Sequence, residues 1–167
     1  MKIRTDFVTN SSSSSFLLAF KSKEDGLEQI AKMVGQYGND FILKLLRDFD
    51  EASPIPKEEL YMRYKDEFES YARWELMVWS WGNRATFQKQ WFADHPGATD
   101  QEYEESEEYA AEKQRLEQEY FQDMMDAVGD CEYLVELEYD DDWHIGSELE
   151  HNILPDQPFT ARRFSHH

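Results

Sequence analysis

The chain has 167 residues and a formal net charge of −19, with 36 acidic against 17 basic side chains. Aromatic residues make up 15% of it, which supplies enough large apolar side chains for a core and excludes a wholly disordered chain. This length fits one domain over residues 1–167.

The acidic residues concentrate in one part of the chain. Between Asp100 and Asp142 there are 18 acidic residues against only Lys113 and Arg115, a balance of −16. Such a field repels phosphate backbones, so direct nucleic-acid binding is disfavoured. It suits a basic protein as partner, or it serves solubility alone.

The single cysteine, Cys131, cannot form an internal disulfide and provides no cysteine-based zinc cluster. The N-terminal stretch lacks the apolar run of a signal peptide, and no segment approaches the roughly 20 apolar residues of a membrane-spanning helix. We therefore expect a cytoplasmic protein that makes no use of a membrane.

The N-terminal part predicts two strands with a polar connection. The apolar run FLLAF, residues 16–20, is typical of a strand covered on both faces, and residues 2–8 are a weaker candidate. Five serines lie between them: Ser11, Ser12, Ser13, Ser14 and Ser15.

We expect this serine run to form a solvated loop, because serine hydroxyls readily bond nearby backbone in turns. The alternatives are modification of the hydroxyls, a phosphate cradle and a serine nucleophile. The last two lack the glycines that usually accompany them.

The spacing of apolar residues then changes to that of helices. Ser22 can cap a first helix, Gly38 is placed to end it in a left-handed conformation, and residues 41–49 predict a second helix. Residues 51–56, EASPIP, break the chain before a third helix. In that helix WELMVWSW, residues 74–81, is apolar nearly all round, which predicts the centre of the core.

A long acidic helix is expected over about residues 100–128. Thr99 and Glu102 match a capping box at its start, and its length would be on the order of 40 Å. Its first half has little apolar surface to bury, so we expect that half to lie on the surface or to project. It offers a partner surface for a basic protein: Glu104, Glu105, Glu107 and Glu108.

The C-terminal part predicts more strand. Residues 131–142, CEYLVELEYDDD, alternate with a period of two. Ser147 and Glu150 match a second capping box before a short helix, and residues 158–167 are a candidate last strand. The fold class is therefore α+β: a small, antiparallel sheet of N- and C-terminal strands, with a helical insertion over about residues 22–128.

The two ends of the chain carry a resemblance. The opening MKIRTDFVTNSSSSSF, residues 1–16, resembles an N-terminal stretch of other bacterial proteins of uncharacterised function. The closing LEHNILP, residues 149–155, and RRFSHH, residues 162–167, are similar to the ends of some of them. The resemblance implies no known activity and no catalytic residue. It implies that the two ends act together.

Four of the five histidines lie near the C-terminus among carboxylates, and these side chains are the ligand types of zinc, manganese or iron. The candidate ligands of a divalent metal are His144, Glu148, His151 and His167. Glu148 and His151 would share a helix face, whereas a helix beginning at Ser147 leaves His144 outside. Arg162 and Arg163 are candidates to hold an anionic substrate. The alternative is that the terminal histidines are simply exposed.

The sequence favours a non-enzymatic binding or interaction protein that uses the acidic helix. The second hypothesis is a metal-dependent hydrolase that activates water at the C-terminal histidines.

Overall fold

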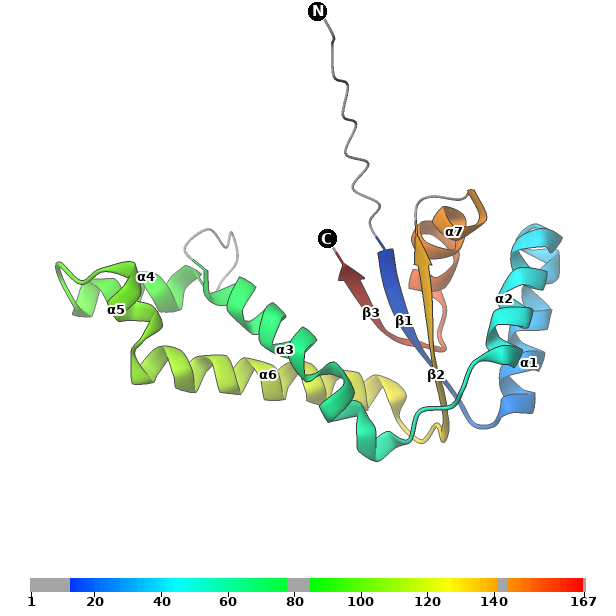
Figure 1. Cartoon of the computed structure of the whole chain (residues 1–167), viewed down its shortest axis with the longest axis horizontal. Coiled ribbons are helices and arrows are strands. Elements are labelled where there is room, and N and C mark those ends of the chain that lie inside the picture. Colours follow the sequence, from blue (N-terminus) through cyan, green and yellow to red (C-terminus); the bar gives the residue numbers. More distant parts are fainter. Residues whose placement is uncertain (1–12, 78–84, 141–143, 167) are drawn as a thin grey trace, which may run out of the picture. The chain divides into compact units, whose positions relative to one another are not determined.

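The computed structural model describes residues 13–77, 85–140 and 144–166 (Figure 1). The chain divides into two compact units. The sheet unit comprises Met1–Lys57 and Ala127–His167, and the helical unit comprises Glu58–Asp126. Within the described residues, every helix is too short or too polar to cross a lipid bilayer.

The sheet unit contains a three-stranded antiparallel sheet with the order β2-β1-β3. Strand β1 (Ser13–Phe20) is central and pairs with β2 (Tyr133–Asp140) and β3 (Thr160–His166). The apolar run of β1 and the alternating pattern of β2 therefore form neighbouring strands. The predicted α+β fold, with a small sheet of N- and C-terminal strands, is confirmed.

The central strand begins before the apolar run. Ser13–Ser15 belong to β1, and Ser14 and Ser15 are buried. The expected solvated loop is wrong for these three serines, because strand pairing on both sides continues to Ser13. Ser11 and Ser12, and the strand expected over residues 2–8, lie outside the described residues.

Two helices of the sheet unit follow β1: α1 (Lys23–Lys32) and α2 (Asn39–Glu51). The Ser22 hydroxyl accepts a hydrogen bond from the Asp25 amide and so caps α1, as predicted. Gly38 has a φ of −59° and is the N-cap of α2, so its expected left-handed role at the end of α1 is wrong. A 3-10 turn, Met33–Gly35, ends α1 instead.

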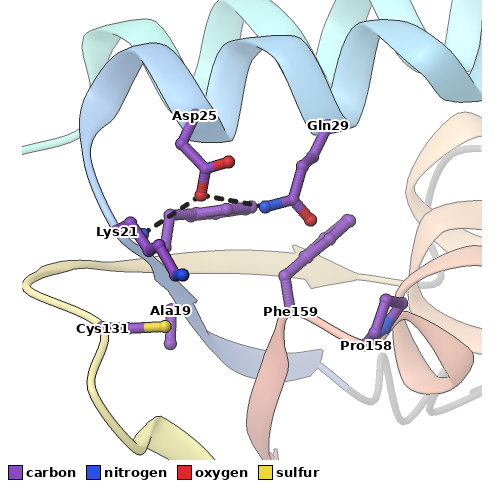
Figure 2. A pocket seen from close by; sticks show the side chains of 8 residues that line it. Ala19, Lys21, Asp25, Gln29, Cys131, Pro158 and Phe159 are labelled. Carbon is purple, nitrogen blue, oxygen red and sulfur yellow. Dashed lines mark hydrogen bonds between the residues drawn. The ribbon is translucent and has the colours of Figure 1, made fainter.

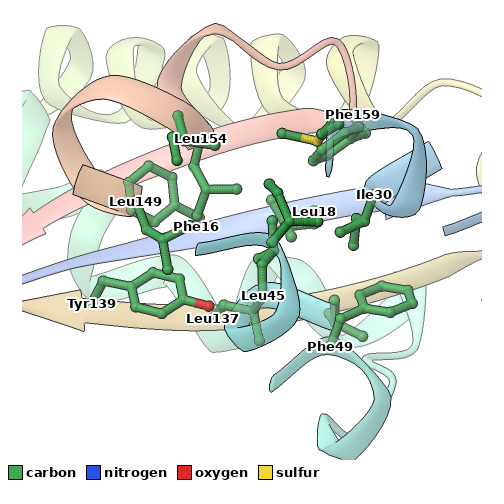
Figure 3. Close-up of a cluster of buried hydrophobic side chains, with 14 of the residues drawn as sticks. Phe16, Leu18, Ile30, Leu45, Phe49, Leu137, Tyr139, Leu149, Leu154 and Phe159 are labelled. Atoms are coloured by element: carbon green, nitrogen blue, oxygen red, sulfur yellow. The ribbon is translucent and has the colours of Figure 1, made fainter. Parts of the chain in front are cut away.

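The main core lies between the sheet and these helices. Figure 3 shows Leu18 of β1 beside Leu45 of α2, and Phe16 of β1 and Phe49 of α2 are buried in the same cluster. Phe49 also meets the ring of Phe20 edge-on, with 5.1 Å between centroids. The apolar run of β1 is therefore the centre of this core.

The segment between β2 and β3 is helical. Helix α7 (His144–Glu148) continues into the π-helical turn η3 (Leu149–Ile153) and the 3-10 turn η4 (Leu154–Asp156). The second predicted capping box is wrong, since Ser147 lies inside α7 and the Glu150 side chain is buried.

The helical unit contains α3 (Leu60–Leu76), α4 (Ala85–Asp94), α5 (Asp100–Glu104) and most of α6 (Glu107–Val128). The last two residues of α6, Ala127 and Val128, belong to the sheet unit. A 3-10 turn, Lys57–Glu59, precedes α3.

Aromatic pairs join α3 to α6 within the helical unit. Phe68 lies 6.0 Å from Phe121 and Tyr71 lies 5.8 Å from Tyr120, measured between ring centroids. Residues 74–81, predicted to form the centre of the core, are only partly buried where the structure describes them. Trp74 is 62% exposed and Met77 is 48% exposed, so the prediction is wrong for both, whereas Leu76 is buried as expected. Residues 78–81 lie outside the described residues.

The acidic helix is interrupted, so the prediction of one continuous helix is wrong. Thr99 and Glu102 do form the predicted capping box at the start of α5. Ser106 then donates a hydrogen bond to the Tyr103 carbonyl (2.7 Å) and accepts one from the Tyr109 amide (3.1 Å). These bonds end one helix and cap the next.

Candidate functional site

Three residues that are distant in the sequence meet in the sheet unit. The hydroxyl of Ser14 donates a hydrogen bond to Glu150 Oε1 at 2.7 Å. Arg163 donates from Nε (3.2 Å) and Nη2 (3.1 Å) to Ser14 Oγ. Its Nη2 also donates to Glu150 Oε1 at 3.2 Å. We call Ser14, Glu150 and Arg163 the terminal cluster, since it joins β1 to η3 and β3.

The backbone brings these side chains together. Ser14 and Phe16 lie on the same face of β1, because side chains two residues apart in a strand point the same way. Arg163 lies opposite Phe16 in the register, and its guanidinium lies 5.7 Å from the centre of the Phe16 ring. The π-helical turn supplies Glu150, and such turns are frequent at functional sites.

The terminal cluster is mostly buried. Ser14 is 0% and Glu150 is 1% exposed, while the Arg163 side chain keeps 34% of its surface exposed. Glu150 Oε2 has no hydrogen-bond donor among the described residues; His151 Nε2 lies 3.9 Å from it. Taking a carboxylate out of water costs several kcal/mol, so the arginine and the serine compensate part of that cost.

This geometry limits the chemistry of Ser14. Its proton is donated to a carboxylate, its oxygen accepts from a guanidinium, and no surface of it reaches solvent. Nucleophilic attack and hydroxyl modification both require access to that oxygen, so neither is supported at Ser14. The cluster acts as a polar link between the two ends of the chain.

The predicted metal ligands are only partly placed. His144 begins α7, Glu148 accepts a hydrogen bond from the Asn152 amide (2.9 Å), and His151 is exposed. Across the residues that the structure describes, no group of three or more His, Cys, Asp or Glu side chains is arranged to hold a metal ion. His167 lies outside them. The metal site stays a prediction, and elemental analysis of untagged protein tests it.

The two arginines predicted to hold an anion lie on opposite faces of β3, because adjacent strand residues point to opposite sides. Arg162 is opposite Leu17, and Arg163 belongs to the terminal cluster. They therefore do not converge on one anion. The sequence pattern missed the cluster's acid, Glu150, because its partners come from both ends of the chain and no local spacing reveals them.

The first part of the acidic region, residues 100–108, is exposed at each of its acidic positions, and we call it the acidic segment. It has no basic residue, and every one of its six acidic side chains is exposed. These are Asp100, Glu102, Glu104, Glu105, Glu107 and Glu108. The four residues predicted as a partner surface are among them.

A buried tyrosine anchors the acidic segment, contrary to the expectation that this region has little to bury. Tyr103 is 1% exposed, and its ring lies 5.3 Å from Trp91, 5.6 Å from Phe92 and 5.1 Å from Tyr109, measured between centroids. Its hydroxyl donates to the Leu76 carbonyl at 3.4 Å. Burial raises the pKa of Tyr103 to about 12. The backbone that carries the acidic side chains is therefore held in place by the packing of Tyr103.

The nearest basic residues in the sequence are used by other carboxylates. Lys113 and Arg115 each form two ion pairs, with N···O distances from 2.7 to 3.5 Å. Within the described part of the chain, Glu104, Glu107 and Glu108 form no ion pair. The partners of the two basic residues are Glu69, Glu112, Glu117 and Glu119.

No family model, no curated protein and no solved structure matches this chain. The likeness of its two ends to uncharacterised bacterial proteins stays a prediction.

Proposed function

We propose that this protein is a non-enzymatic binding protein and that its acidic segment binds a basic protein. The supporting observation is the row of six exposed acidic side chains between Asp100 and Glu108, which contains no basic residue. Charge of one sign on a fixed surface raises the local concentration of an oppositely charged partner and speeds its association.

Helix stability explains only part of this charge. Acidic side chains in the first turns of α5 and α6 interact favourably with the helix dipole. Glu104 and Glu105 are the last residue and the C-cap of α5, where the dipole disfavours negative charge. Their repulsion of neighbouring acids opposes folding, and a basic partner would relieve it.

Binding of a synthetic lysine-rich peptide tests the proposal. The test variant replaces the four acids of the predicted partner surface with glutamine. The control variant removes the same charge from four exposed acids elsewhere: Glu51, Glu58, Glu59 and Asp66.

We expect the test variant to bind the peptide about tenfold more weakly, a change of about 1.4 kcal/mol, and the control variant to differ little from the wild type. Added salt should weaken wild-type binding and reduce the difference between the variants. Equal weakening in both variants would show that the peptide responds only to net charge, and would overturn the proposed site.

A further inference from the structure

A pocket of about 370 Å³ lies in the sheet unit beside the start of α1 (Figure 2). Its apolar wall includes Phe20 and Phe159, which are buried and whose ring centroids are 4.9 Å apart. Asp25 and Gln29 extend into it from one side of α1, because they are four residues apart in the helix. Such a volume, with an apolar floor and a few polar groups, is typical of a small-ligand site.

The carboxylate of Asp25 keeps one oxygen available to the pocket. Its Oδ2 accepts from the Gln29 side-chain amide (2.9 Å) and from the Lys21 backbone amide (3.1 Å). These hydrogen bonds, that from Gln29 first, lower the pKa of Asp25, so the group is ionised at neutral pH. Within the described residues, Oδ1 has no hydrogen bond and the carboxylate has no ion pair.

A positive charge borders the same pocket. The exposed side chain of Lys21 lines it and, in the described part of the chain, pairs with no carboxylate. The Lys21 backbone amide bonds Asp25, and the charge of the Lys21 ammonium also lowers the pKa of Asp25, although the two side chains form no ion pair within the described residues. Figure 2 shows Lys21 and Cys131 on one side of the pocket, with Phe159 and Pro158 on the other. Two opposite charges and an apolar wall thus border one cavity.

We propose that this pocket binds a small zwitterion with an apolar side chain, of the chemical class of a free apolar amino acid. The ligand ammonium bonds Asp25 Oδ1 and the Gln29 side-chain oxygen. The ligand carboxylate pairs with the Lys21 ammonium, and the apolar side chain rests on the accessible part of the wall, at Pro158 and Phe159. This inference is independent of the acidic segment, which belongs to the other unit.

The single cysteine provides a reporter of occupancy. Cys131 lines the pocket, and burial raises the pKa of its thiol, so alkylation by iodoacetamide depends on access. The experiment measures this alkylation rate in the full chain at increasing L-leucine concentration. Isopentylamine lacks the carboxylate of leucine, and 4-methylpentanoate lacks its ammonium.

We expect leucine to protect Cys131 from alkylation. Each analogue should give half-protection only at about tenfold higher concentration than leucine, because each lacks one charge-assisted contact. Absence of protection by leucine, or equal protection by all three compounds, would overturn the proposal.

Two charge variants assign the contacts. Asp25→Asn keeps a hydrogen-bond acceptor and should weaken protection by leucine and by isopentylamine. Lys21→Gln, at an exposed position, should weaken protection by leucine and by 4-methylpentanoate. The controls are Glu28→Gln on α1 and Lys65→Gln in the helical unit, which each break one exposed ion pair outside the pocket. Equal effects in the controls and the two variants would contradict the assignment.

Discussion

At the scale of single residues, the terminal cluster gives one member of the serine run, Ser14, a structural role. Ser14 lies in the central strand and contacts Glu150 and Arg163 from the C-terminal part of the chain. A buried carboxylate is tolerated only where donors compensate its lost hydration. Each member of the cluster is therefore required by the other two.

Arg163→Leu should lower the free energy of unfolding by about 3 kcal/mol, because it leaves Glu150 buried without its charged partner. Removing one partner of a buried ion pair usually costs about 3–5 kcal/mol, and we take the lower value because the Arg163 side chain is one-third exposed. Urea unfolding measures the change. The double variant Arg163→Leu/Glu150→Leu removes both charges and should recover part of the loss. A double variant less stable than the single one would contradict this account.

Two buried tyrosines predict alkaline sensitivity. Burial raises the pKa of Tyr103 to about 12. The pKa of Tyr139 is also raised, first by burial and then by the negative charge of Asp48, which accepts a hydrogen bond from the Tyr139 hydroxyl (2.9 Å). Both groups stay protonated in the folded state when an unfolded tyrosine, with a pKa of about 10, ionises. Their contribution to stability is complete below that pH and is lost as pH rises through the folded-state pKa values.

The free energy of unfolding should therefore fall above about pH 10. Tyr139→Phe removes one of these groups and should make the decline shallower, although it also removes the bond to Asp48. Urea unfolding at a series of alkaline pH values measures both curves. Parallel curves would show that Tyr139 does not contribute.

At the scale of elements, one close contact sets the packing of α1 on α2. Gly26 is buried in α1, and a Cβ atom there would lie 2.3 Å from Phe49 Cζ. Gly26→Ala should lower the free energy of unfolding by about 1–2 kcal/mol, because overpacking outweighs the better helix propensity of alanine. Gly35→Ala, with no atom within 4 Å of the new Cβ, should be neutral or slightly stabilising. Thermal unfolding compares them, and equal effects would exclude the contact as the cause.

The sequence predicted those elements whose signals are local. The period of two in β2 and the capping box of Thr99 and Glu102 both depend on neighbouring residues, and both are present. The break at Ser106 was missed because a serine inside an acidic, helix-forming run does not by itself favour an end. Only the hydrogen bonds to Tyr103 and Tyr109 show that it caps.

The candidate sites were less predictable. Exposure of the acidic segment follows from its composition, so its four predicted partner residues are all exposed. The terminal cluster depends on strand register: Ser14 lies beside Arg163 only because both ends of the chain pair in one sheet. The pocket at Asp25 depends in the same way on Phe159, which comes from the opposite end.

At the scale of the whole molecule, the sheet unit is formed from two separate parts of the chain, which meet near the helical unit's boundaries. Lys57 Nζ donates to the Gly129 carbonyl at 2.9 Å, and the Ile55 amide donates to the Leu134 carbonyl at 2.7 Å. The two points where the helical unit leaves and rejoins are therefore close together.

Replacing residues 58–126 with a short Gly/Ser linker should give a folded sheet unit, because the linker closes a smaller loop at lower entropic cost. Dispersed amide resonances and a cooperative unfolding transition would identify it. Leu18→Asp in the shortened chain places a charge at a fully buried position and provides an unfolded control. A shortened chain that resembles this control would contradict the independence of the unit.

The central position of β1 has a consequence for synthesis on the ribosome. This strand is made before both of its neighbours, which are residues 133–140 and 160–166. At about 5–20 residues per second, translation leaves the apolar strand without partners for roughly 6–24 seconds, until β2 has been made. During that time its backbone is a template for pairing with other nascent chains. A truncated chain that ends before β3 would keep one edge of it permanently open, and would be a substrate for chaperones and proteases.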